Sequence, residues 1–107
     1  MKNYNEKTSM EKAAEQFSIL TAGLAILGIE NEFKIDRFGE ENGLHILIDF
    51  PDESISIVWN PMSMGYRSGL LEAWSFEHGK TFTDEEGHPY GYMTAFEILA
   101  KLERKVR

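Results

Sequence analysis

Residues 44–59 read LHILIDFPDESISIVW, and the alternation within this segment sets the expected fold class. In both halves every second residue is apolar, which is the pattern of strands that bury one face of a sheet. Pro51, Asp52 and Glu53 separate the halves and have the composition of a tight turn. The segment therefore predicts two consecutive antiparallel strands. Their expected buried face carries Leu44, Ile46, Ile48, Phe50, Ile55, Ile57 and Trp59.

Two more strands are expected, one on each side of this pair. Residues 32–38 alternate apolar and charged side chains. The Glu-Glu-Asn-Gly sequence at 40–43 predicts the turn that follows, because Asn-Gly is common where φ is positive. Residues 70–77 predict a fourth strand of poorer alternation, and residues 79–92 predict a loop. One face of the fourth strand carries Leu70, Glu72, Trp74 and Phe76.

Helices are expected at both ends of the chain. Thr8 and Glu11 match the T-x-x-E capping box, and Thr94 and Glu97 repeat it near the C-terminus. Apolar residues recur at helical spacing after each box, and Gly28 predicts the end of the first helix. The two apolar stripes consist of Met10, Ala13, Ala14, Phe17, Leu20, Leu24 and Leu27, and of Ala95, Ile98, Leu99, Leu102 and Val106.

The predicted fold is a single α+β domain over residues 1–107, because a chain of 107 residues is near the commonest size of one domain. The order is helix–strand–strand–strand–strand–helix, with a four-stranded antiparallel meander and both helices on one face of the sheet. Gly23, inside the first helix, is expected to allow close packing against a neighbour. The core is expected to contain Phe17, Leu20, Ile46, Ile48, Ile57 and Leu99.

The chain carries a net charge of −7, and its acidic residues are unevenly distributed. Residues 30–53 hold eight acidic and two basic residues, and residues 72–86 hold five acidic residues and one basic residue. Direct binding to nucleic acid is disfavoured, because such binding depends on neutralising phosphates. The acidity favours solubility. Alternatively, the acidic strands imitate a phosphate backbone and inhibit a nucleic-acid-binding partner.

The absence of cysteine excludes disulfides, thiolate metal sites and cysteine nucleophiles. The longest apolar run, residues 19–29, is shorter than the ~20 residues that a bilayer requires. Glu6, Glu11 and Glu15 interrupt any signal-peptide pattern at the N-terminus. We therefore expect a cytoplasmic protein of bacterial or phage type, with no membrane segment.

No group of residues in the sequence matches a standard catalytic or metal-binding motif. His78 and His88 flank an acidic segment, residues 84–86, but the spacing is that of no standard zinc, iron or calcium site. His45 would need a nucleophile or an orienting carboxylate, and the sequence offers only Asp49 on the same strand face. We therefore expect no catalytic residue, no metal and no cofactor. The enzymatic alternative is a small-ligand cleft near His78 and His88.

The segment 60–69 (NPMSMGYRSG) is the strongest candidate for a contact surface, because methionine, tyrosine and arginine are enriched at interfaces. The alternative is that its aromatic side chains fold back and cap one end of the sheet. We expect a small, non-catalytic interaction module whose partner is another protein or a second copy of the chain. The predicted binding residues are Trp59, Met62, Met64, Tyr66, Arg67, Tyr90 and Tyr92.

Overall fold

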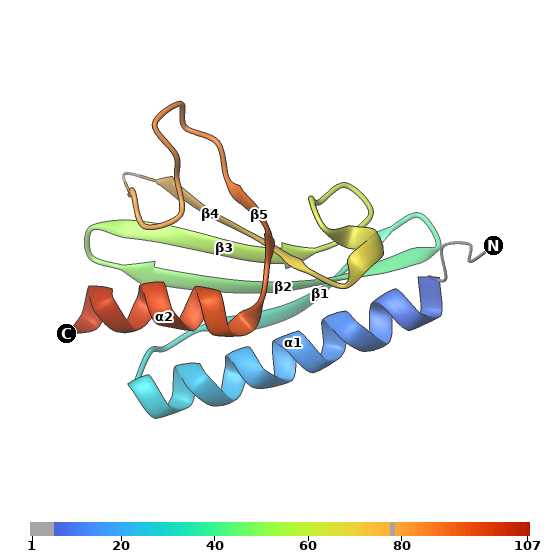
Figure 1. Cartoon of the computed structure of the whole chain (residues 1–107), viewed down its shortest axis with the longest axis horizontal. Coiled ribbons are helices and arrows are strands. Elements are labelled where there is room, and N and C mark those ends of the chain that lie inside the picture. The colour runs from blue at the N-terminus through green and yellow to red at the C-terminus, as the bar shows by residue number, and fades with distance from the viewer. Residues whose placement is uncertain (1–5, 78) are drawn as a thin grey trace.

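A computed structural model describes residues 6–77 and 79–107 of the chain. It has two layers, an antiparallel sheet and a pair of helices that both lie on one face of the sheet (Figure 1). This arrangement confirms the predicted α+β class and the predicted placement of the helices. The elements are α1 (Glu6–Leu27), β1 (Glu32–Phe38), β2 (Glu41–Phe50), β3 (Glu53–Trp59), a 3-10 turn (Tyr66–Ser68), β4 (Leu71–Glu77), β5 (Tyr90–Met93) and α2 (Ala95–Val106).

The sheet is a meander in which each strand pairs antiparallel with the next along the chain, in the order β1-β2-β3-β4-β5. Ile46 lies opposite Phe33 on one side and opposite Ile57 on the other, so these residues share the face that points toward the helices. Ile46, Ile48, Ile55 and Ile57 are all buried, which confirms the predicted inward face of β2 and β3.

The number of strands differs from the prediction, because residues 79–92 are not entirely a loop. Their last three residues belong to β5, a four-residue strand whose pairing with β4 shifts between Leu71 and Ala73. Tyr92 has a positive φ of 54° at this irregularity. A strand so short and irregular has no period-2 alternation, and no sequence pattern could reveal it. On β4 the buried residues are Leu71, Ala73 and Ser75, whereas Trp74 and Phe76 face away from the helices.

The turn between β1 and β2 also differs from the prediction. It consists of Gly39 and Glu40, with Gly39 at a φ of 66°, and the predicted turn at 40–43 is wrong. Asn42 and Gly43 already belong to β2, where they pair with residues of β1. Gly39, three residues before Asn42, adopts the left-handed conformation that was expected of the Asn-Gly pair.

The helix termini were predicted in part. The structure is already helical at Glu6, so the predicted capping box at Thr8 and Glu11 is wrong; a T-x-x-E pattern also occurs inside helices. The predicted end at Gly28 is confirmed by its φ of 71° and by the 2.9 Å bond from the Ile29 N–H to the Leu24 carbonyl. At α2 the capping box of Thr94 and Glu97 is confirmed, since each side chain accepts the other residue's backbone N–H.

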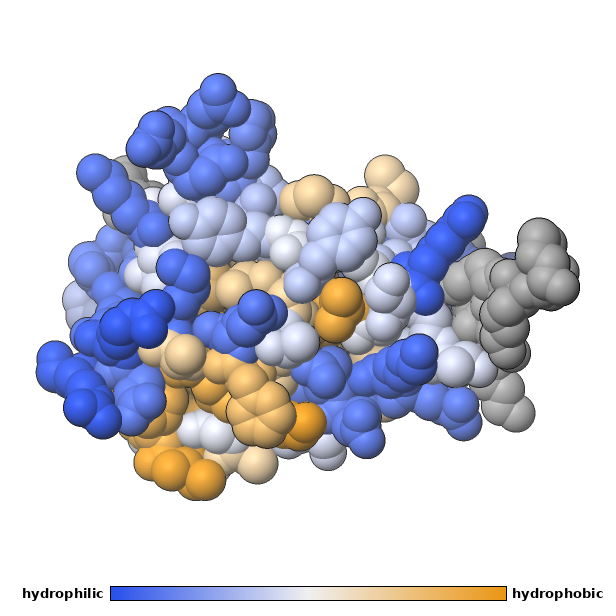
Figure 2. Space-filling model, viewed as in Figure 1, coloured by the Kyte–Doolittle hydropathy of each residue, from blue (hydrophilic) through white to orange (hydrophobic). Residues whose placement is uncertain are grey.

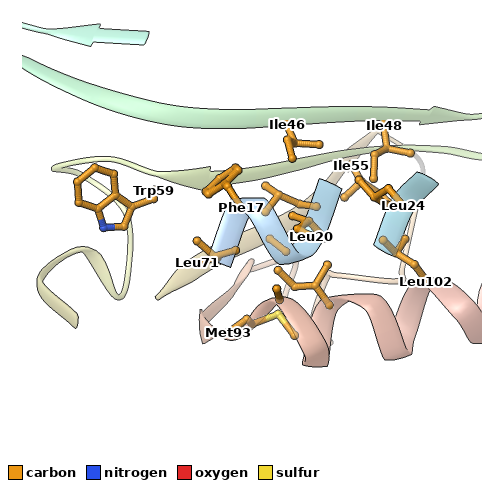
Figure 3. Close-up of a cluster of buried hydrophobic side chains, with 14 of the residues drawn as sticks. Phe17, Leu20, Leu24, Ile46, Ile48, Ile55, Trp59, Leu71, Met93 and Leu102 are labelled. Atoms are coloured by element: carbon orange, nitrogen blue, oxygen red, sulfur yellow. The ribbon is translucent and has the colours of Figure 1, made fainter. Parts of the chain in front are cut away.

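The helices pack closely against each other and against the sheet. A Cβ on Gly23 would overlap the Leu99 side chain, which confirms the close packing predicted for this glycine. Gln16 of α1 accepts the backbone N–H of Ala95, the first residue of α2, at 2.6 Å. Figure 3 shows side chains of both helices meeting those of β2 and β3 in one cluster. Of the predicted core, Phe17, Leu20, Ile46, Ile48 and Ile57 are buried, and Leu99 is partly buried against them.

The core also contains a carboxylate that links three distant segments. Glu53, at the start of β3, is 5% exposed. Its Oε2 lies 2.9 Å from Lys105 Nζ of α2 and also accepts the Thr81 hydroxyl, while Oε1 accepts the Thr81 backbone N–H at 3.3 Å. Burial alone would raise the pKa of Glu53, but these hydrogen bonds outweigh that effect and lower its pKa to about 2.

We predict that Glu53 makes the fold sensitive to acid. Because its pKa is depressed from 4.5 to about 2 on folding, its contribution is complete above pH 4.5 and is lost as the pH falls toward 2. The loss should be on the order of 3 kcal/mol. Urea unfolding between pH 6 and pH 2 should show this slope in the native chain and a flatter slope in Glu53→Gln. Equal slopes in the two proteins would contradict the prediction.

Candidate functional site

Part of the predicted contact segment is committed to the core. Trp59 is 1% exposed, and its ring stacks on Tyr66 with the ring centroids 4.7 Å apart. The indole N–H of Trp59 and the hydroxyl of Ser9 both donate to the Tyr66 carbonyl, the former at 2.7 Å. The segment 60–69 therefore closes the core over the first turns of α1, as the capping alternative describes.

The other predicted binding residues are divided over the surface. Met62 is 83% and Tyr92 62% exposed, and Arg67 is also exposed. Met64 lies against β5, where a Cβ on Gly91 would collide with it. Tyr90 is half-buried between Phe82 and Lys101. The exposed members of the set are Met62, Met64, Arg67 and Tyr92.

We predict that substitutions of two residues of this segment change the free energy of unfolding by very different amounts. Tyr66→Ala should lower the free energy of unfolding by about 2 kcal/mol or more, because it removes the ring that stacks on Trp59. Met62→Ala, the matched control, should change it by less than about 0.5 kcal/mol, because Met62 is 83% exposed. Urea denaturation measures both effects. A Tyr66→Ala variant as stable as the native chain would show that the segment does not complete the core.

The acidic segment near His88 has an internal structural role. Asp84 accepts the backbone N–H groups of Glu86 at 2.9 Å and of His88 at 2.8 Å. The hydrogen bond from His88 is the main cause that lowers the pKa of Asp84. The enzymatic alternative also includes His78, which lies outside the described residues. Within residues 6–77 and 79–107, no three His, Cys, Asp or Glu side chains gather in a way that could hold a metal ion.

Three hydrogen-bonded side chains that the sequence did not reveal form a row across the open face of the sheet, which is the face without helices. His45 Nδ1 lies 3.1 Å from Asp36 Oδ2, and His45 Nε2 lies 3.0 Å from Ser56 Oγ. The expected neighbour, Asp49, instead accepts a hydrogen bond from Ser54 at 2.8 Å. The sequence alone could not identify Asp36 and Ser56, because they are diagonal to His45 on neighbouring strands and depend on the register.

The chain from Asp36 through His45 to Ser56 has the order of a catalytic triad, but acyl transfer also needs oxyanion donors near the nucleophile. Ser56 lies in the middle of β3, which has β2 on one side and β4 on the other. In a central strand the backbone N–H groups bond to the neighbouring strands, so the Ser56 amide is engaged by the sheet. The three side chains are best explained as cross-strand bonds that fix the register of β1, β2 and β3.

β1 is the part of the sheet that the helices leave uncovered. None of its residues is buried. Phe33 and Ile35 lie on the helix side of the sheet, opposite Ile46 and Leu44, yet they are 47% and 61% exposed. In the described part of the chain β1 pairs with β2 only, so one side of its backbone is open. β1 is therefore a seven-residue edge strand with exposed apolar side chains.

A stripe of uncharged residues on α1 lies next to this edge. The rings of Phe17 and Phe33 are 6.1 Å apart, which places the Phe17 side of α1 beside β1. Met10 and Ala14 precede Phe17, and Thr21 follows it, at helical spacing on the same stripe. Met10 is 37% exposed and Ala14 is exposed. We call β1 together with the outer residues of this stripe the β1 edge surface, formed by Met10, Ala14, Thr21 and residues 32–38.

A second apolar surface lies on the outside of the helix layer. Ile26 of α1 is 85% exposed and Phe96 of α2 is 68% exposed. They border a groove of about 320 Å³, and Figure 2 shows hydrophobic colouring over this part of the helices. The residues that line the groove are Gly23, Ile26, Leu27, Phe96, Leu99, Ala100 and Glu103.

Comparisons with models of protein families, with curated proteins and with solved structures found no match. Neither helix of the described residues has the length and apolar character that a bilayer-spanning helix requires.

Proposed function

We propose that the chain is a small, non-catalytic protein-interaction module that binds its partner by strand addition at β1. The observation that supports this proposal most directly is the exposure of Phe33 and Ile35, 47% and 61%, on the side of an edge strand that faces the helix layer. A partner strand beside β1 would receive its backbone hydrogen bonds from this edge and its side-chain contacts from Phe33 and Ile35.

Covering this edge would stabilise a complex more than covering one isolated exposed residue would. Completing the burial of Phe33 and Ile35 would contribute about 1 kcal/mol for each side chain, since each is already about half covered. The added strand would also satisfy the open backbone groups of β1, which otherwise bond only to water. Long, exposed apolar edges are uncommon in proteins that act as monomers, because they promote unwanted pairing.

The segment 60–69 supports interaction less well. Tyr66, its aromatic residue, stacks on Trp59 of β3, and the Tyr66 carbonyl accepts hydrogen bonds from Trp59 and Ser9 within the fold. In a typical interface, aromatic residues that insert into the partner carry most of the affinity, and Tyr66 already packs within its own fold instead. What remains at the surface is flexible methionine with Arg67 and Tyr92, which makes this region the alternative contact site.

The charge pattern of β1 also argues against imitation of nucleic acid. A phosphate backbone is an uninterrupted row of negative charges. On the open face of β1, Lys34 lies between Glu32 and Asp36, so the charges alternate in sign. Alternating charges fit a complementary protein strand better than they fit a basic groove.

Photo-cross-linking in the cells that naturally produce the chain tests this proposal. A light-activated phenylalanine derivative would replace Ile35 in one variant, Met62 in a second and Ile26 in a third, all of which are exposed. We expect a discrete adduct from the position of Ile35 and none from the other two positions, provided that all three variants melt like the native chain. Adducts from the position of Met62 alone would move the contact site to the segment 60–69.

A further inference from the structure

We infer that the strand added to β1 is β1 of a second copy, so that two chains form a two-fold dimer with one continuous ten-stranded sheet. This inference rests on the proposed function and specifies its partner. Three properties of β1 and its surroundings support it: the position of its central residue, the order of its charges, and the stripe of uncharged residues on α1 beside it.

The first property is the match in length and face. β1 spans Glu32–Phe38, so Ile35 is its middle residue. When two copies pair antiparallel with Ile35 opposite Ile35 of the second copy, all seven residues of each strand overlap. In this register the inward residues of one copy lie opposite the inward residues of the other, so all four helices cover the same face.

The second property is the charge order, which selects this register. With Ile35 at the two-fold axis, Lys34 of each copy lies opposite Asp36 of the other, giving two ion pairs on the open face. A shift by two residues one way places Lys34 opposite Lys34 of the second copy, and a shift the other way places Asp36 opposite Asp36 of the second copy. Both shifts bring like charges together and shorten the overlap.

The ion pairs are compatible with the contacts already present in one chain. Asp36 Oδ2 lies 3.1 Å from His45 Nδ1, and a carboxylate has two oxygens that together accept several hydrogen bonds. Asp36 could therefore hold His45 in its own chain and Lys34 of the second copy at the same time. Arg37 would lie opposite Phe33 of the second copy, where its aliphatic stem and guanidinium suit an aromatic ring.

The third property concerns the helix layer. The two-fold axis that joins the β1 strands also turns the α1 stripes of both copies, which carry Met10, Ala14 and Thr21, toward each other across the paired strands. Small and uncharged side chains allow two helices to approach without desolvating charge. The contact surface of each copy consists of one strand and one helix. It is about 23 Å long and about 20 Å deep, so the dimer would cover roughly 500 Å² of each copy. The total of roughly 1,000 Å² is below the size of standard specific interfaces and is typical of a weak, reversible dimer.

Paired charge reversals test this dimer with the purified full chain. Lys34→Glu places Glu opposite Asp36 twice, and Asp36→Lys places Lys opposite Lys34 twice, so each variant alone should dissociate. Mixed together, the two variants form two attractive pairs in the same register. Sedimentation equilibrium should show a native dimer, a dissociation constant raised at least about tenfold in each variant, and recovery of dimer in the mixture.

Two control variants and a stability check make the outcomes decisive. Ile26→Lys and Met62→Lys alter exposed apolar residues outside the β1 edge surface and should leave the dimer intact. Thermal melting confirms that every variant is folded. A native chain that stays monomeric up to about 1 mM, a mixture that stays monomeric, or dissociation by Ile26→Lys instead of Lys34→Glu would each overturn the inference. A monomeric chain that still gives an adduct at Ile35 would retain strand addition with a different partner.

Discussion

The width of the helix layer limits how much of the sheet can be buried. Each helix is about 10–12 Å wide with its side chains, whereas five strands spaced by about 4.8 Å occupy about 24 Å. The pair of helices is therefore no wider than the sheet, and β1 is the strand that it leaves without a buried residue. The contact between Phe17 and Phe33 is where the coverage ends, and β1 beyond it has no buried residue. The apolar residues of β1 consequently face water in an isolated chain.

Contacts in the rest of the molecule hold this edge in place. The hydrogen bonds that His45 makes with Asp36 and with Ser56 fix β1 in register with the two strands behind it. Glu53 and Lys105 tie the opposite end of the sheet to α2, and the stacked Trp59 and Tyr66 rings close the end near α1. A rigid sheet presents its edge strand β1 in a preformed conformation, which lowers the entropic cost of pairing with another strand.

The sequence predicted what depends on local chemistry and regular alternation. The inward face of β2 and β3, the cap at Thr94 and the close packing at Gly23 follow from the identity and spacing of nearby residues. The fifth strand was missed because it has only four residues and an irregular register. The bonds around His45 and the exposure of β1 depend on which strands pair and how far the helices reach. The sequence predicted residues 32–38 as a strand but could not show which strand would be left at the edge.

The central claim is that the open side of β1 is covered by another chain in solution. Hydrogen–deuterium exchange of the purified protein, compared at low and high micromolar concentration, measures this directly, because backbone amides that enter a new strand pairing exchange more slowly. We expect residues 32–38 to become protected as the concentration rises, while β5 at the other edge of the sheet does not change. Exchange of β1 that stays equally fast over the whole concentration range would contradict the claim.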